Sequence, residues 1–164
     1  MDREELTELI MDLYEARKEA KEYLDFFVEP NIEAKLTKAR TAISKEASRV
    51  SRGRARPRLT KVKQFIKDIS SLNPGPEPEM EIMIYTVEKF CEIGSQNWIK
   101  DATQKSLAKL LHDTIIRADR HGLLNIALPR IEAAVKNMDS SKFYNRDFKS
   151  LLNETLSDTV ESLT

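Results

Sequence analysis

The sequence predicts an all-α fold, either an irregular bundle of seven to eight short helices or a short solenoid-like array of α-hairpins. Only four of the 164 residues are glycine, 33% are charged, and apolar residues recur at helical spacing along most of the chain. No repeat with a period near 34 or 40 residues is visible, so the bundle is preferred. The length suits one domain, which we expect to span residues 1–164.

Four helices are predicted in the first half of the chain. Two apolar stripes with the i, i+3, i+4 spacing of a helical face predict two helices, or one bent helix, that end before Pro30. A third helix is expected over residues 32–50, with Asn31 as its N-cap, and a fourth over 62–72, with Thr60 near its start. The first two stripes consist of Leu6, Leu9, Ile10 and Leu13, and of Ala20, Tyr23, Leu24 and Phe27.

A Pro-rich connection over residues 73–78 is expected to separate these helices from four more. Gly94 suits a left-handed C-terminal position, so we expect it to end the fifth helix, and Gly122 to end the sixth. Pro129 is tolerated only in the first turn of the seventh helix. The four helices are expected over residues 80–93, 98–118, 128–138 and 148–160.

Charge is strongly segregated along a chain whose net charge is zero. Residues 34–67 carry twelve Lys or Arg against the single Glu46, which is a net charge of +11. Residues 1–33 have a net charge of −7, and residues 68–164 have −4. Like charges crowded into one segment repel one another, so this distribution bears on surfaces and partners rather than on a reaction.

The positive charge is densest in seven residues, which we call the basic segment. The stretch in which they lie includes a connection, which is expected over residues 51–58, between the third and fourth helices. Cations at the start of the fourth helix oppose the helix dipole, so helix stability does not explain them. The basic segment consists of Arg49, Arg52, Arg54, Arg56, Arg58, Lys61 and Lys63.

Three interpretations of the basic segment remain open. In the first interpretation, the acidic residues 1–33 neutralise the basic segment, or it is simply solvated. In the second, it binds an acidic protein or a membrane surface. In the third, it binds the phosphates of a nucleic acid. Arg52-Gly53-Arg54 resembles the core of the AT-hook, but the flanking prolines are missing. No aromatic residue is interleaved with the cations, which disfavours stacking on single strands.

The sequence offers no catalytic or cofactor site. His112 and His121 are nine residues apart, too far to share a helical face, and Cys91 is the single cysteine. A Gly-rich phosphate loop and a nucleophile elbow are both missing. We expect no metal and no cofactor, and we expect Cys91 to pack as a small core residue.

The acidic residues of the second half are expected to face solvent, except for one helical ion pair. Carboxylates are favoured at the start of a helix, and an acid and a base four residues apart form an ordinary surface pair. The residues concerned are Glu77, Glu79 and Glu81 in the Pro-rich connection, Glu88 and Glu92 on one helix, and Asp113 with Arg117.

Several stretches resemble a family of small bacterial helical proteins of unknown function. The resemblance covers about half of the chain, up to Gly94, and implies a bacterial, all-helical protein without implying any catalytic residue. In the family a basic turn precedes a helix, whereas here Arg54-Ala55 lies between Gly53 and Arg56. The stretches are Leu13-Tyr14, Lys21-Glu22-Tyr23-Leu24-Asp25, Arg56-Pro57-Arg58-Leu59, Phe65-Ile66-Lys67, Leu72-Asn73-Pro74 and Met83-Ile84-Tyr85-Thr86-Val87-Glu88.

Taken together, these features predict a non-enzymatic, cytoplasmic protein-interaction module whose contact surface is the basic segment. The alternative is a nucleic-acid-binding protein that uses the residues from Arg52 to Arg58. No stretch approaches the apolar length of a membrane span, and the acidic N-terminus does not resemble a secretory signal. The identity of the partner and the oligomeric state stay open at this stage.

Overall fold

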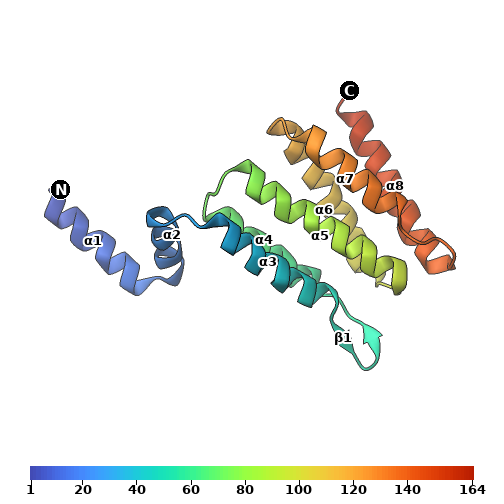
Figure 1. Ribbon diagram of the computed structural model, residues 1–164, viewed down its shortest axis with the longest axis horizontal. Coiled ribbons are helices and arrows are strands. Elements are labelled where there is room, and N and C mark those ends of the chain that lie inside the picture. The colour runs from blue at the N-terminus through green and yellow to red at the C-terminus, as the bar shows by residue number, and fades with distance from the viewer.

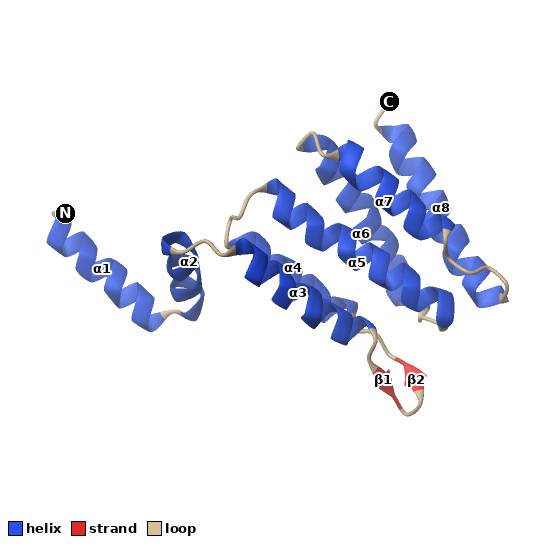
Figure 2. Ribbon diagram, viewed as in Figure 1, coloured by secondary structure: helices blue, strands red, loops and turns tan.

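The computed structural model describes residues 1–164 and consists of eight helices and one very short β-hairpin (Figure 2). The prediction of an all-α bundle is therefore confirmed. The elements are α1 (Arg3–Ala16), α2 (Lys18–Val28), α3 (Ile32–Ala47), β1 (Val50–Ser51), β2 (Arg54–Ala55), α4 (Leu59–Ser71), α5 (Pro76–Gln96), α6 (Asp101–Arg120), α7 (Leu124–Lys136) and α8 (Phe143–Ser162).

Helix α5 forms the centre of the bundle that α3 to α8 build. It packs against α3, α4, α6, α7 and α8, and it contributes eleven buried residues, among them Val87 and Phe90 with no exposed surface. One connected cluster of 29 buried apolar residues extends from Leu36 in α3 to Leu152 in α8. The hydrophobic core therefore lies in α3–α8, and burial of this apolar surface is the main force that holds these helices together.

Helices α1 and α2, the N-terminal helix pair, stand apart from this bundle (Figure 1). Asp2 caps α1 through a reciprocal capping box with Glu5, and the hydroxyl of Tyr14 donates a 2.8 Å hydrogen bond to Asp25 across the two helices. Helix α1 packs against α2 alone, and neither helix contains a buried residue. The pair is thus helical by its local sequence but adds nothing to the core.

Two expected helix boundaries are wrong because close packing overrides a local signal. Gly94 does not end α5, which continues to Gln96. A Cβ atom at Gly94 would overlap the ring of Phe148, so glycine here lets α8 approach α5. Residues 73–78 are not a full connection either, because α5 already begins at Pro76, with its prolines in the first turn, where a missing N–H is tolerated.

Two other helices also differ from expectation at their ends. Helix α7 begins at Leu124, so Pro129 lies inside the helix rather than in its first turn. Helix α3 begins after its predicted N-cap Asn31, whose side chain accepts from the backbone of Ala34, but it ends at Ala47. Val50, expected on the apolar face of this helix, instead belongs to β1 and is 65% exposed.

Candidate functional site

The basic segment projects from the bundle as a β-hairpin between α3 and α4 (Figure 1). Ser51 pairs with Arg54, which leaves Arg52 and Gly53 as a two-residue turn. Both residues have positive φ angles, 53° and 72°, the geometry of a type I′ turn, whose twist suits a tight hairpin. Arg52-Gly53-Arg54 is therefore a tight turn, not the extended arm that an AT-hook needs to enter a minor groove.

Three of the seven cations are used within the protein. The guanidinium of Arg58 donates to both carboxylate oxygens of Glu46, at 2.6 and 2.9 Å. Arg49 donates to the backbone carbonyl of Arg56, at 3.3 Å, and the ammonium of Lys63 donates to the hydroxyl of Ser106, at 2.7 Å. The Arg58–Glu46 contact attaches the base of the hairpin to α3, and the Lys63–Ser106 contact joins α4 to α6.

The other four cations have no partner in the chain. Arg52, Arg54, Arg56 and Lys61 make no salt bridge and no side-chain hydrogen bond, and all but Arg56 are exposed. Elsewhere, Arg40, Arg117 and Arg130 pair with carboxylates, whereas Arg3, Arg17, Arg120 and Arg146 have no salt bridge. The four unpaired cations of the basic segment differ from these isolated arginines because they are neighbours, with Arg52 and Arg54 at the tip of the hairpin, Arg56 after β2 and Lys61 on α4.

The bidentate contact with Arg58 changes the acidity of Glu46. The hydrogen bonds from the guanidinium, with the charges of Arg58, Lys61 and Arg49, hold the pKa of this carboxyl below its ordinary value of 4.5. The side chain of Glu46 is 11% exposed, and that of Arg58 is 41% exposed. Glu46 is the one acid within residues 34–67, and it anchors the hairpin rather than neutralising its tip.

Aromatic side chains lie beside the unpaired arginines, which sequence reasoning did not predict. Arg54 and Arg56 line a cleft of about 370 Å³ together with Trp98, from the turn between α5 and α6, and Tyr144, from α8. Trp98 is 51% exposed, and Tyr144 carries the ammonium of Lys142 at 5.8 Å from its ring centroid. The cleft therefore combines guanidinium groups with one exposed ring, Trp98, and one half-buried ring, Tyr144.

A second, smaller cleft continues the basic surface on the other side of Arg56. It has a volume of about 190 Å³ and is lined by Arg49, Arg56, Arg58 and Lys100, with Thr103. Lys100 precedes α6 and lies far from the basic segment in sequence. The fold therefore adds one cation and two rings from two distant segments to the predicted cluster. We call the two clefts, together with Arg52 at the hairpin turn, the basic surface.

The acidic residues 1–33 do not neutralise the basic segment within the chain. The salt bridges of this region, from the N-terminus to Glu5 and from Lys18 to Glu22, stay inside the helix pair. The helix pair is attached at the start of α3, whereas the β-hairpin follows its end, about 24 Å away for a helix of sixteen residues. Neutralisation of the basic segment by residues 1–33 is therefore excluded within the chain, because the two opposite charges lie at opposite ends of α3.

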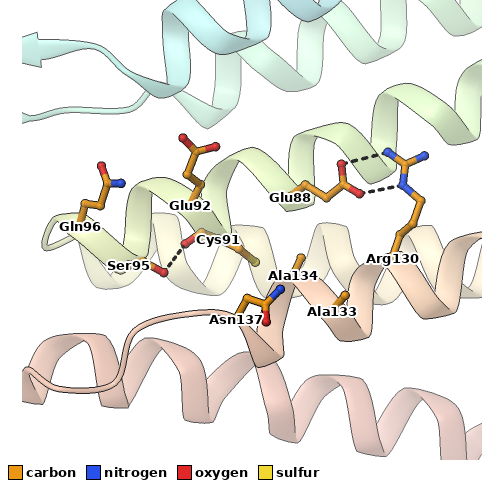
Figure 3. A pocket seen from close by; sticks show the side chains of 9 residues that line it. All are labelled: Glu88, Cys91, Glu92, Ser95, Gln96, Arg130, Ala133, Ala134 and Asn137. Carbon is orange, nitrogen blue, oxygen red and sulfur yellow. Dashed lines mark hydrogen bonds and ion pairs between the residues drawn. The ribbon is translucent and has the colours of Figure 1, made fainter.

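Another cleft, of about 500 Å³, lies between α5 and α7 (Figure 3). Its charged groups are already satisfied, since the guanidinium of Arg130 donates to Glu88 at 2.7 and 2.9 Å. These hydrogen bonds raise the pKa of Arg130, and burial raises the pKa of the Cys91 thiol to about 12. The cleft thus presents a protonated thiol and a neutralised carboxylate, not a nucleophile beside a base.

Several acids expected at the surface pair with arginines across the bundle. Glu79 is 7% exposed and accepts from Arg117 at 2.6 Å, so Arg117 does not pair with Asp113 as the i, i+4 spacing predicted. Glu81 lies between Arg40 and Arg130, and Glu88 is bound by Arg130. These contacts join α3, α5, α6 and α7, a tertiary arrangement that helical spacing alone does not reveal.

The remaining candidate groups are structural in their contacts. His112 is exposed, with its Nδ1 atom 2.9 Å from the hydroxyl of Thr159, and Cys91 is buried in the core as predicted. His, Cys, Asp and Glu side chains form no group of three that could hold a metal ion. Among the eight helices, none combines the length and the apolar character that crossing a membrane requires.

Comparison with known proteins gives one match, which extends over most of the chain. A family model described as a family of unknown function (DUF6155) matches residues 1–154. No curated protein and no solved structure matches the chain. The match extends well beyond Gly94, where the resemblance in sequence motifs ended.

Proposed function

The chain belongs to DUF6155, a family of unknown function, and we propose that it acts as a non-enzymatic protein-interaction module whose contact surface is the basic surface around Arg52, Arg54 and Arg56. The partner is an acidic segment of another protein. The observation that carries this proposal is the cluster of neighbouring cations, Arg52, Arg54, Arg56 and Lys61, that make no salt bridge and no side-chain hydrogen bond within the chain.

A rigid platform supports the unpaired cations. The type I′ turn fixes Arg52 and Arg54, and the Arg58–Glu46 pair holds the base of the hairpin against α3. Arginine suits carboxylate recognition because its planar guanidinium can donate two parallel hydrogen bonds. Because these side chains have no internal partner to give up, an acidic peptide gains charge-assisted contacts without breaking existing ones.

The test is a titration of the purified protein with a fluorescein-labelled poly-glutamate peptide, measured by anisotropy. The variant Arg52→Ser/Arg54→Ser/Arg56→Ser leaves Arg58 in place, so the pair with Glu46 is intact. We expect this variant to bind at least about tenfold more weakly than the native protein. The control Lys109→Ser/Arg120→Ser/Lys136→Ser removes three exposed cations elsewhere and should bind normally; equal loss in both variants, or none in either, contradicts the proposal.

The second candidate function is binding of single-stranded nucleic acid, which Trp98 and Tyr144 favour. Rings beside cations are the arrangement in which bases stack while phosphates are neutralised. The variant Trp98→Leu distinguishes the two candidate functions. For a labelled oligothymidylate, we expect binding through this cleft to weaken about five- to a hundredfold. Binding of poly-glutamate should be unchanged, because a carboxylate needs no stacking surface.

A further inference from the structure

The N-terminal helix pair exposes more large apolar side chains than the rest of the protein together. Leu6, Leu9, Ile10 and Leu13 form one stripe on α1, with exposed fractions of 40–47%. On α2, Phe27 and Val28 are 73% and 76% exposed, and Tyr23 is 39% exposed. In the bundle only Val50, Trp98, Ile126 and Phe143 are comparable. A contiguous apolar surface of this kind marks an interaction site.

The helix pair also lacks the contacts that stabilise short helices. Helices α1 and α2 have 14 and 11 residues, at or below the length at which an isolated helix is marginal in water. Apart from the hydrogen bond between Tyr14 and Asp25, they support each other through half-exposed side chains. A second apolar layer is needed to cover the stripe, as in every stable helical arrangement.

The distribution of charge says which kind of surface provides that layer. With 100° per residue, the acids Glu4, Glu8, Asp12 and Glu15 fall on the face of α1 opposite to the apolar stripe. On α2 the acids Glu22 and Asp25 likewise lie opposite to Phe27. The apolar face itself is therefore uncharged, and its complement is another uncharged apolar face rather than a basic one.

The size of the apolar face fits a stable dimer. The exposed fractions of the seven side chains on α1 and α2 add up to between three and four fully exposed residues. Five of the seven are aliphatic, so we take roughly 150 Å² for each, the lower end of the range for aromatic residues, which gives on the order of 550 Å² per copy. The two copies together would then exceed the total of about 1,000 Å² that a specific protein interface should bury. An identical stripe on a second copy satisfies both the chemistry and the area.

We propose that two copies of this chain associate through α1 and α2, the apolar stripe of one helix pair packing against that of the other across a two-fold axis. The arrangement is isologous, so each copy contributes the same residues and the contact closes on itself. The acids of α1 and α2 remain on the outside of the resulting four-helix cluster. The inference is independent of the proposed function, because the basic surface lies at the other end of α3.

The test is the mass of the full-length protein by sedimentation equilibrium over a range of concentrations. We expect a monomer–dimer equilibrium in the native protein. The variant Leu9→Gln/Ile10→Gln/Leu13→Gln should raise the dimer dissociation constant at least about a hundredfold. Phe27→Ser/Val28→Ser, on the other helix, should act in the same direction. The control Ile126→Gln changes an apolar residue of 49% exposure on α7 and should leave the dimer intact.

The salt dependence identifies the face that the second copy uses. Two helix regions of net charge −7 repel each other, so the proposed dimer should tighten between about 50 and 500 mM NaCl. A helix pair docked on the basic segment of another copy would instead weaken with salt and be lost in Arg52→Ser/Arg54→Ser. A dimer that weakens with salt in this way would overturn the proposal. A monomer at every concentration would also overturn it, and so would a dimer that the α1 and α2 variants do not weaken.

Discussion

Helices α1 and α6 have stripes with the same helical spacing, but the stripe of α6 is buried and the stripe of α1 is exposed. In α6, Leu107, Leu110, Leu111 and Thr114 occupy positions i, i+3, i+4 and i+7, and their exposed fractions are 0–6%. In α1, the residues at the same spacing, Leu6 to Leu13, are 40–47% exposed. Helix α6 packs against α5, α7 and α8, whereas α1 packs against α2 alone.

The difference between these helices shows what an amphipathic pattern does and does not predict. The spacing predicts that a helix forms and that one face avoids water. It does not say whether the covering surface belongs to the same chain. In α3–α8, other helices of the same chain cover the apolar faces. In the N-terminal helix pair, the covering surface has to come from a second copy of the chain. The two regions should therefore respond very differently to similar substitutions.

The largest effect is expected from Phe148→Ala, at the contact between α8 and α5. Phe148 is 2% exposed and fills the space that Gly94 leaves open. Removing the ring should lower the free energy of unfolding by about 3–5 kcal/mol, because the lost transfer energy and a residual cavity add together. Urea unfolding followed by circular dichroism measures this change. A loss below about 1 kcal/mol would mean that the two helices do not pack closely.

An intermediate effect, present near neutral pH and lost at acidic pH, is expected from Glu46→Gln. The pKa of Glu46 is held below 4.5 by Arg58, so the folded state favours the ionised form. The stability that this provides is complete above the ordinary carboxyl pKa and is lost as pH falls through the lowered value. Melting temperatures measured from about pH 6 to pH 3 should therefore fall less steeply in the variant than in the native protein. If the melting temperatures of the variant and the native protein fell in parallel with pH, the Arg58–Glu46 pair would not anchor the hairpin.

The smallest effect is expected from Leu9→Ala in the helix pair. In dilute, monomeric protein, the free energy of unfolding should change by no more than about 0.5 kcal/mol, because the side chain is already 45% exposed and outside the core. The matched control is Leu110→Ala, at the equivalent position of the α6 stripe, which should cost about 2–5 kcal/mol. Similar losses in the two variants would show that the comparison between the regions is wrong.

The sequence predicted the helices well, because their apolar spacing and caps are local properties. Asn31 caps α3 as expected, and each predicted helix has a counterpart in the structure. The errors arose where tertiary packing decides. Gly94 looks like the end of a helix, but it lies within α5 and leaves space for the ring of Phe148. Pro129 lies inside α7, because this helix begins earlier than the apolar spacing indicated.

The candidate site was predictable only in part. The cations of the basic segment are adjacent in sequence, and the structure keeps them together at one hairpin. Trp98, Lys100 and Tyr144 join them from segments more than thirty residues away, which no local pattern could indicate. The one available signal was Trp98, a tryptophan in the polar stretch that follows α5, and it is 51% exposed.

Hydrogen exchange followed residue by residue at two protein concentrations tests most directly whether the helix pair depends on a second copy. In dilute monomer, we expect the amides of α1 and α2 to exchange rapidly, since no buried contact opposes their opening, while those of α6 exchange slowly. At a concentration where the dimer dominates, α1 and α2 should become protected and α6 should stay unchanged. Equal protection of α1 and α6 in the monomer would contradict the claim, because it would mean that the chain itself covers the apolar stripe.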